Sequence, residues 1–158
     1  MKYVILFLLS LISWCSFAQI NDTVFINFST KYQEMKKEKY KFSEGSSMSY
    51  GYFIRQMEKE TYGDIHFIFS HPQRNEEHNK YFGGKNPIVL KKPKSYLDGK
   101  KVLDINFFRT TPYTEIAKTF EEEDSWEQDV MIFMVDVDEI KNDSIVLREV
   151  TFTKPVKE

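Results

Sequence analysis

Cysteine is almost absent from this chain. Only one of its 158 residues, Cys15, is a cysteine, and it lies in an apolar N-terminal segment. A domain that follows this segment therefore has no disulfide, no thiolate nucleophile and no cysteine metal ligand. The sequence also lacks a nucleophile elbow, a zinc-protease helix motif, a phosphate-binding loop and a dinucleotide-binding glycine motif. These absences argue against the common enzyme classes but leave room for an unfamiliar active site.

The N-terminal segment is the most specific feature that is present. Lys2 precedes an apolar run over residues 3–12, and Ala18 ends a small-residue cleavage pattern just before Gln19. This arrangement predicts a secretory signal peptide over residues 1–18, because the apolar run is too short for a stable membrane span. We therefore expect cleavage between Ala18 and Gln19 and export of the rest of the chain.

The same segment contains an alternative to simple cleavage. The four residues that end at Cys15 resemble a bacterial lipoprotein box, in which the cysteine is lipidated and becomes the new N-terminus. Trp14 departs from that motif, which takes Gly or Ala beside the cysteine. Lipidation of Cys15 stays open as an alternative to a soluble exported protein.

Composition indicates a bacterial source. The chain has 18 lysines but four arginines and two alanines, a bias typical of an AT-rich genome. An exported domain without cysteine is also more typical of bacteria than of an animal secretory pathway. We expect residues 19–158 to form a single globular domain that is periplasmic or secreted, with no further transmembrane segment.

Charge is nearly balanced overall but unevenly distributed. The formal net charge of −2 gives no reason to expect nucleic acid as a partner. Lys85–Lys101 carries six lysines and one acid, whereas Glu121–Asp129 carries six acids and no base. We interpret each stretch as a solvated face, with orientation toward a charged partner as the alternative.

The hydrophobic pattern predicts an α+β fold with a mainly antiparallel sheet and one or two short helices packed on it. A continuous apolar run over residues 130–135 predicts a central strand that is covered on both faces. Pro112 at a first helical position predicts a helix to about residue 122. The lysine-rich stretch 31–41 is interpreted as an exposed helix or loop, and 102–108 as a strand. Further strands are expected over residues 24–28, 50–57, 64–70, 88–90 and 145–153.

Tyrosines are concentrated in the middle third of the chain. Their flat rings and polar hydroxyl groups suit a glycan or peptide surface, although packing at the rim of a sheet explains them as well. The candidate binding residues are Tyr50, Tyr52, Tyr62, Tyr81 and Tyr96.

The chain has three histidines, which are His66, His71 and His78. In one continuous strand His66 and His71 would point to opposite faces, which disfavours a shared metal site. We expect no metal and no cofactor. A hydrolase that pairs His71 or His78 with an acid such as Glu77 is an alternative.

Three functions follow from these features. The first is a non-enzymatic exported domain that binds or supports another envelope component. The second is a binder of a glycan or other small ligand through the tyrosine-rich strands. The third is a small hydrolase.

Overall fold

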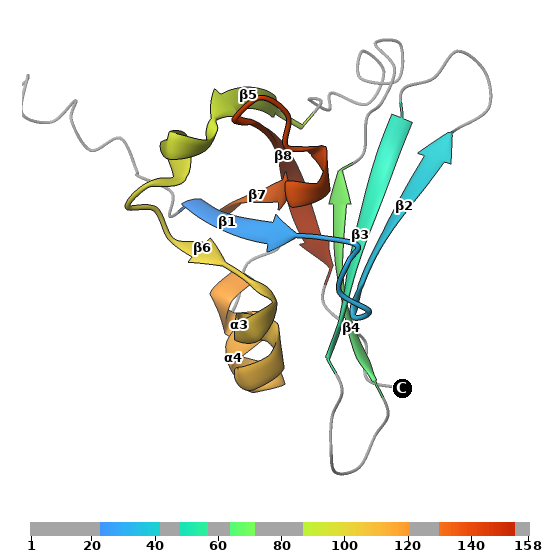
Figure 1. The fold of residues 1–158 in the computed structure, drawn as a ribbon. Coiled ribbons are helices and arrows are strands. Elements are labelled where there is room, and N and C mark those ends of the chain that lie inside the picture. Colours follow the sequence, from blue (N-terminus) through green and yellow to red (C-terminus); the bar gives the residue numbers. More distant parts are fainter. Residues whose placement is uncertain (1–22, 42–47, 57–63, 72–86, 121–129, 154–158) are drawn as a thin grey trace, which may run out of the picture.

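A computed structural model describes residues 23–41, 48–56, 64–71, 87–120 and 130–153 (Figure 1). The described chain is mostly β-sheet with two short α-helices, so the fold is broadly α+β. No helix in these ranges is long and apolar enough to cross a membrane. The elements are, in order, β1 (Thr23–Phe28), β2 (Met35–Lys41), β3 (Met48–Gln56), β4 (Ile65–His71), β5 (Val89–Pro93), the 3-10 helix η1 (Lys94–Leu97), β6 (Val102–Leu103), α3 (Ile105–Thr110), α4 (Tyr113–Phe120), β7 (Met131–Asp136), the 3-10 helix η2 (Val137–Glu139) and β8 (Ser144–Thr153).

The sheet is mixed rather than purely antiparallel. Its strand order is β2-β3-β4-β8-β7-β1-β6, and β5 also pairs with β8. Strand β1 runs parallel to both β6 and β7, whereas the other described pairs are antiparallel. The expectation of a mainly antiparallel sheet therefore missed the parallel pairs at one end of the sheet, which β1 forms with β6 and β7 from the second half of the chain.

Strand β8 connects two parts of the sheet. Its first half pairs with β5 and β7, and its last three residues pair with β4. In Figure 1, β2, β3 and β4 lie to one side of β8, and β1, β6 and β7 lie to the other, with α3 and α4 below. The two parts enclose the larger core cluster, to which β1, β3, β4, β7 and both helices contribute.

The apolar run over residues 130–135 forms the central strand β7, as expected. Ile132 and Met134 belong to the larger core cluster, whereas Phe133 and Val135 face a second cluster with Phe25. Alternate side chains thus enter two different cores, which is the pattern of a strand covered on both faces.

Two local predictions were wrong. Residues 35–41 form strand β2 rather than a helix or loop, because full pairing with β3 outweighs the weak strand propensity of lysine. Residues 105–110 form helix α3 rather than a strand. Asp104 caps α3 by accepting hydrogen bonds from the backbone N–H groups of Asn106 and Phe107, so the helix begins where a strand was expected.

Candidate functional site

The inner face of β2, β3 and β4 changes from apolar to polar along the strands. Residues directly opposite one another on neighbouring strands share a face of the sheet. This register produces three successive rows, which are Met35–Ile54–Phe67, Lys37–Tyr52–Phe69 and Lys39–Tyr50–His71. The first row lies in the core beside α3 and α4, and the third is polar. A polar surface is therefore built at one end of a continuous core.

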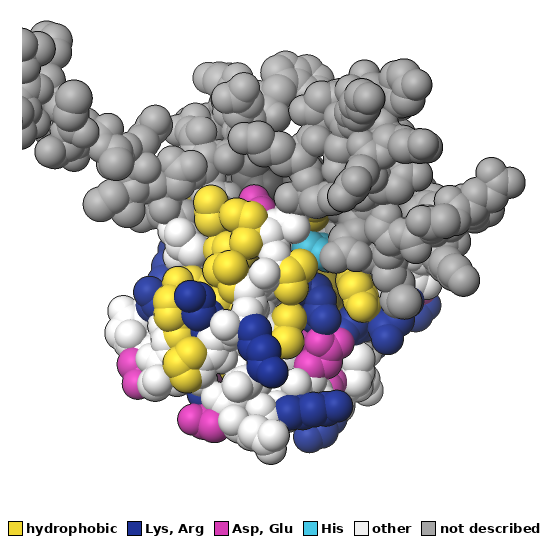
Figure 2. All heavy atoms as spheres, turned by 90° about the horizontal axis from the view of Figure 1, so that it is seen from above, with side chains coloured by type: hydrophobic (Ala, Val, Ile, Leu, Met, Phe, Trp, Pro, Cys, Tyr) yellow, Lys and Arg dark blue, Asp and Glu magenta, His cyan; other side chains and the backbone are white. Residues whose placement is uncertain are grey.

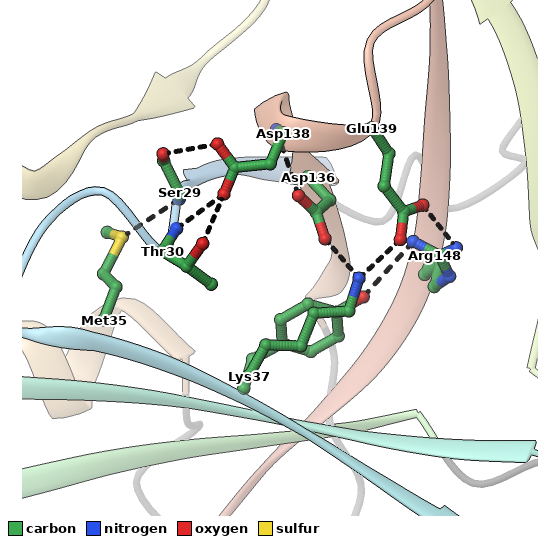
Figure 3. A network of polar contacts seen from close by, with 9 residues as sticks. Ser29, Thr30, Met35, Lys37, Asp136, Asp138, Glu139 and Arg148 are labelled. Carbon is green, nitrogen blue, oxygen red and sulfur yellow. Dashed lines mark hydrogen bonds and ion pairs between the residues drawn. The ribbon is translucent and has the colours of Figure 1, made fainter.

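Four charged side chains form an ion-pair network beside the second and third rows (Figure 3). The Lys37 ammonium group donates to the Asp136 carboxylate and, at 2.5 Å, to Glu139 Oε1. The second Glu139 oxygen accepts a hydrogen bond from Arg148 Nη2 at 2.6 Å. Two cations and two carboxylates therefore neutralise one another, and β2 is connected to η2 and β8.

The network holds Glu139 and Lys37 in their charged forms. Burial opposes ionisation of Glu139, but hydrogen bonds from Lys37 and Arg148 outweigh it and hold the pKa of Glu139 below its ordinary value. Burial likewise opposes the charge on Lys37, and its two carboxylate partners raise its pKa above the usual value. At neutral pH Glu139 and Lys37 are therefore not poised to exchange a proton.

Helix η2 is fixed in place by its own contacts. The Asp138 carboxylate accepts hydrogen bonds from Ser29 Oγ at 2.8 Å and from the Thr30 N–H at 2.7 Å (Figure 3). The Asp138 N–H in turn donates to Asp136 Oδ1 at 3.1 Å. The carboxylates that face Lys37 are therefore positioned by the turn after β1.

Tyr50 and Tyr52 lie next to one another above this network. Their ring centroids are 6.4 Å apart and the rings are nearly parallel. Tyr52 is fully buried, and burial raises its pKa to about 12, so its hydroxyl group stays protonated. Tyr50 is half-buried, and the Arg148 guanidinium lies 4.6 Å from its ring centroid.

His71 lies at the end of the third row, and only one of its two ring nitrogens has a hydrogen-bond partner among the described residues. Its Nδ1 lies 2.6 Å from the backbone oxygen of Glu149, and a carbonyl oxygen only accepts, so Nδ1 carries the proton. Burial, and then the nearby charge of Arg148, lower the pKa of His71, so the ring is neutral. Nε2 is then a hydrogen-bond acceptor. It is buried and has no partner among the residues that the structure describes.

The predicted tyrosine cluster is only partly assembled. Tyr50 and Tyr52 are brought together, but Tyr96 lies on η1, where it packs edge-on against Phe25 in the second core cluster. Tyr62 and Tyr81 lie outside the described residues, as do Cys15 and the predicted cleavage site.

The predicted separation of two histidines is confirmed. On β4, His66 is exposed and His71 is buried, so the pair does not converge. His78 and Glu77 lie outside the described residues. Within the described ranges, no group of three or more His, Cys, Asp or Glu side chains is placed to hold a metal ion.

Sequence reasoning did not single out Lys37, Glu139 and Arg148. Arg148 did carry a signal, because it interrupts the apolar strand pattern of residues 145–150 and is buried. A buried arginine requires a partner. Its partner Glu139 lies only nine residues earlier in the chain. Lys37, which completes the network, is 102 residues from Glu139, and no local pattern connects the two.

A second ion pair joins the buried Glu34 to the exposed Arg109 of α3. Arg109 donates from Nε and Nη2 to the same Glu34 oxygen, at 2.9 and 2.7 Å. This hydrogen bonding holds the pKa of Glu34 below its usual value. The pair joins the turn before β2 to the helix, and we assign it a structural function.

Comparison of the chain with protein-family models, with curated proteins and with solved structures gives no match. The chemistry of the site is therefore the basis for its interpretation. It offers a neutral histidine acceptor, a half-buried tyrosine ring and a set of charges that are already paired.

Proposed function

We propose that this chain is an exported bacterial binding protein whose site, formed by Tyr50, His71 and Lys39, takes a neutral, hydroxyl-rich ligand such as a glycan. The observation that carries the proposal is the buried His71 Nε2 without a partner in the described chain. Buried polar atoms are almost always hydrogen-bonded, so an unpaired acceptor at the end of a polar row favours an external donor. A sugar hydroxyl group is such a donor.

Tyr50 supplies the second element of the proposed site. It pairs directly with His71 across β3 and β4, and the two ring centroids are 6.2 Å apart. Because the cationic groups of Arg148 and Lys37 lie over the Tyr50 ring, we expect a ligand to meet the edge of the ring and its hydroxyl group. Lys39, opposite Tyr50 on β2, is exposed and can donate to ligand oxygens.

The paired charges of the network favour a ligand without strong charge, and leave Lys39 as the one cation of the proposed site outside the network. Lys37 and Arg148 are matched by Asp136 and Glu139, so the network contributes no net charge to the site. A strongly anionic ligand would have to compete with carboxylates that already occupy both cations.

The same contacts make hydrolysis by His71 a weaker alternative. A catalytic base needs its substrate proton within reach and, in Ser–His–Asp sets, an orienting carboxylate on the other nitrogen. In the described chain, His71 Nδ1 is oriented by a backbone carbonyl, and Glu139 is held by two cations. This arrangement suits a binding contact.

The test is to titrate the chain with neutral and with acidic oligosaccharides and to measure the heat of binding by isothermal titration calorimetry. Maltotriose, cellotriose and chitotriose are the neutral probes, and trigalacturonate is the acidic one. We expect saturable binding of at least one neutral probe and at least about tenfold weaker binding by Tyr50→Ala and His71→Ala, since each removes a central contact.

The matched control is Tyr40→Ala. Tyr40 is an exposed tyrosine on β2, and its ring lies against Gly51 on the outer face of the same sheet. Binding should survive this change. Absence of binding to all neutral probes, or equal losses in the Tyr40 and Tyr50 variants, would count against the site. Thermal melts of each variant separate loss of binding from loss of fold.

A further inference from the structure

We propose that β5 and the chain that follows it, residues 88–101, form a platform that docks onto an anionic phospholipid surface. This platform is separate from the proposed ligand site. Between residues 88 and 101 the chain has five lysines, one acid and no arginine. The lysines are Lys91, Lys92, Lys94, Lys100 and Lys101.

The platform combines these lysines with exposed aliphatic side chains. Ile88 and Val89, at the start of β5, are each 44% exposed and are two of the four large hydrophobic residues exposed in the described chain. Viewed from above, hydrophobic and basic side chains adjoin one another on this end of the molecule (Figure 2). Shallow insertion of apolar groups beside basic ones is how peripheral proteins contact membranes.

Tyr96 holds part of the platform together. Lys92 from β5 and Lys100 from the loop after η1 lie over its ring, with ammonium-to-centroid distances of 5.4 and 4.5 Å. Gly99, with a φ of 72°, lies in the left-handed region at the turn that precedes Lys100. Tyr96 is itself anchored on Phe25, so two lysines from separate segments are held together by the core.

The exposed aliphatic side chains of Ile88 and Val89 beside these lysines favour a lipid surface over a purely electrostatic partner, because only a lipid surface also accepts apolar groups. Each lysine near an anionic leaflet adds about fivefold to binding, so several lysines together give a measurable affinity. Asp98, the one acid in the stretch, is exposed beside η1 and lowers the net charge only in part.

The test is co-sedimentation of the exported chain with vesicles of phosphatidylcholine alone or mixed with an equal amount of phosphatidylglycerol. We expect binding to the mixed vesicles that weakens at high salt, and little binding to the neutral ones. A variant with Lys91, Lys94 and Lys101 changed to Gln should bind about 100-fold more weakly. These three lysines are exposed, and the ammonium groups that lie over the Tyr96 ring belong to Lys92 and Lys100 instead.

The matched control changes Lys31, Lys36 and Lys118 to Gln. It alters the net charge equally but on other elements, so it should keep most of the binding. Ile88→Ser should weaken the component of binding that survives high salt. Equal losses in the two triple variants, equal binding to both vesicle types, or binding to soluble polyglutamate but not to vesicles would overturn the proposal.

Discussion

The two ends of the inner face of β2, β3 and β4 differ in chemistry although the same strands form both. At one end Ile54 and Phe67 pack with Phe108 of α3 in the larger core cluster. At the other end Tyr50 and His71 meet the charged groups of η2 and β8. The comparison separates a region that stabilises the fold by burial of apolar side chains from one that is built of polar groups. Buried side-chain atoms without a hydrogen-bond partner occur at both ends in the described chain, as Glu34 Oε2 next to Met35 and as His71 Nε2 in the polar row.

The largest expected effect lies at the apolar end. Phe108→Ala should cost about 3–5 kcal/mol of the free energy of unfolding, because a fully buried ring that contacts Phe67, Phe69 and Phe120 leaves a cavity. Chemical denaturation measures the loss. Tyr50→Ala, at the polar end, should cost only about 1–2 kcal/mol, since the ring is half-buried. Similar losses of unfolding free energy in the Phe108 and Tyr50 variants would contradict the difference between the two ends.

A smaller effect tests whether the ion-pair network matters for stability. A double-mutant cycle of Lys37→Met and Glu139→Gln should give a coupling energy of about 1–3 kcal/mol, because the Lys37 side chain is only 10% exposed. The neighbouring pair Lys36–Glu38 is the control, with side chains 73% and 32% exposed. Its cycle should give a clearly smaller coupling energy, because solvent screens an exposed pair. Equal coupling energies would mean that the network is ordinary surface pairing.

The smallest expected effect concerns pH. Burial lowers the pKa of His71 in the folded state, so the unfolded chain binds a proton first as the pH falls below the ordinary value of 6.5. Stability is thus fully present above that pH and declines below it, toward the lower folded pKa. His71→Gln should flatten the dependence of melting temperature on pH between about pH 7 and pH 5. His66→Gln, on the exposed face of β4, is the control, and an equal flattening there would contradict this origin.

Much of the secondary structure could be predicted from local pattern. The run at residues 130–135 and the stripe on residues 113–120 identified β7 and α4, because burial on both faces or on one face leaves a clear periodicity. Periodicity does not encode which strand pairs with which, so the parallel β1–β7 pairing was missed. Strand β2 was also missed, because its identity depends on pairing with β3 rather than on its own lysines.

The candidate site was predictable only in part. The alternation of Tyr50 and Tyr52 with smaller or apolar residues placed both on one face of a strand, and that placement is correct. Lys39 and His71 join Tyr50 through strand pairing. Glu139 and Arg148, which lie beside the site, come from the second half of the chain. The tautomer of His71 depends on one carbonyl of β8, which no local pattern encodes.

The most direct measurement is nitrogen-15 NMR of the His71 imidazole, with and without the saccharide that binds. We expect Nδ1 to be protonated and Nε2 to be unprotonated at neutral pH, and the Nε2 resonance to shift when a ligand hydroxyl group donates to it. A proton on Nε2 in the free protein would contradict the assignment of His71 as an acceptor. An Nε2 resonance unchanged at saturation with ligand would exclude His71 from the binding site.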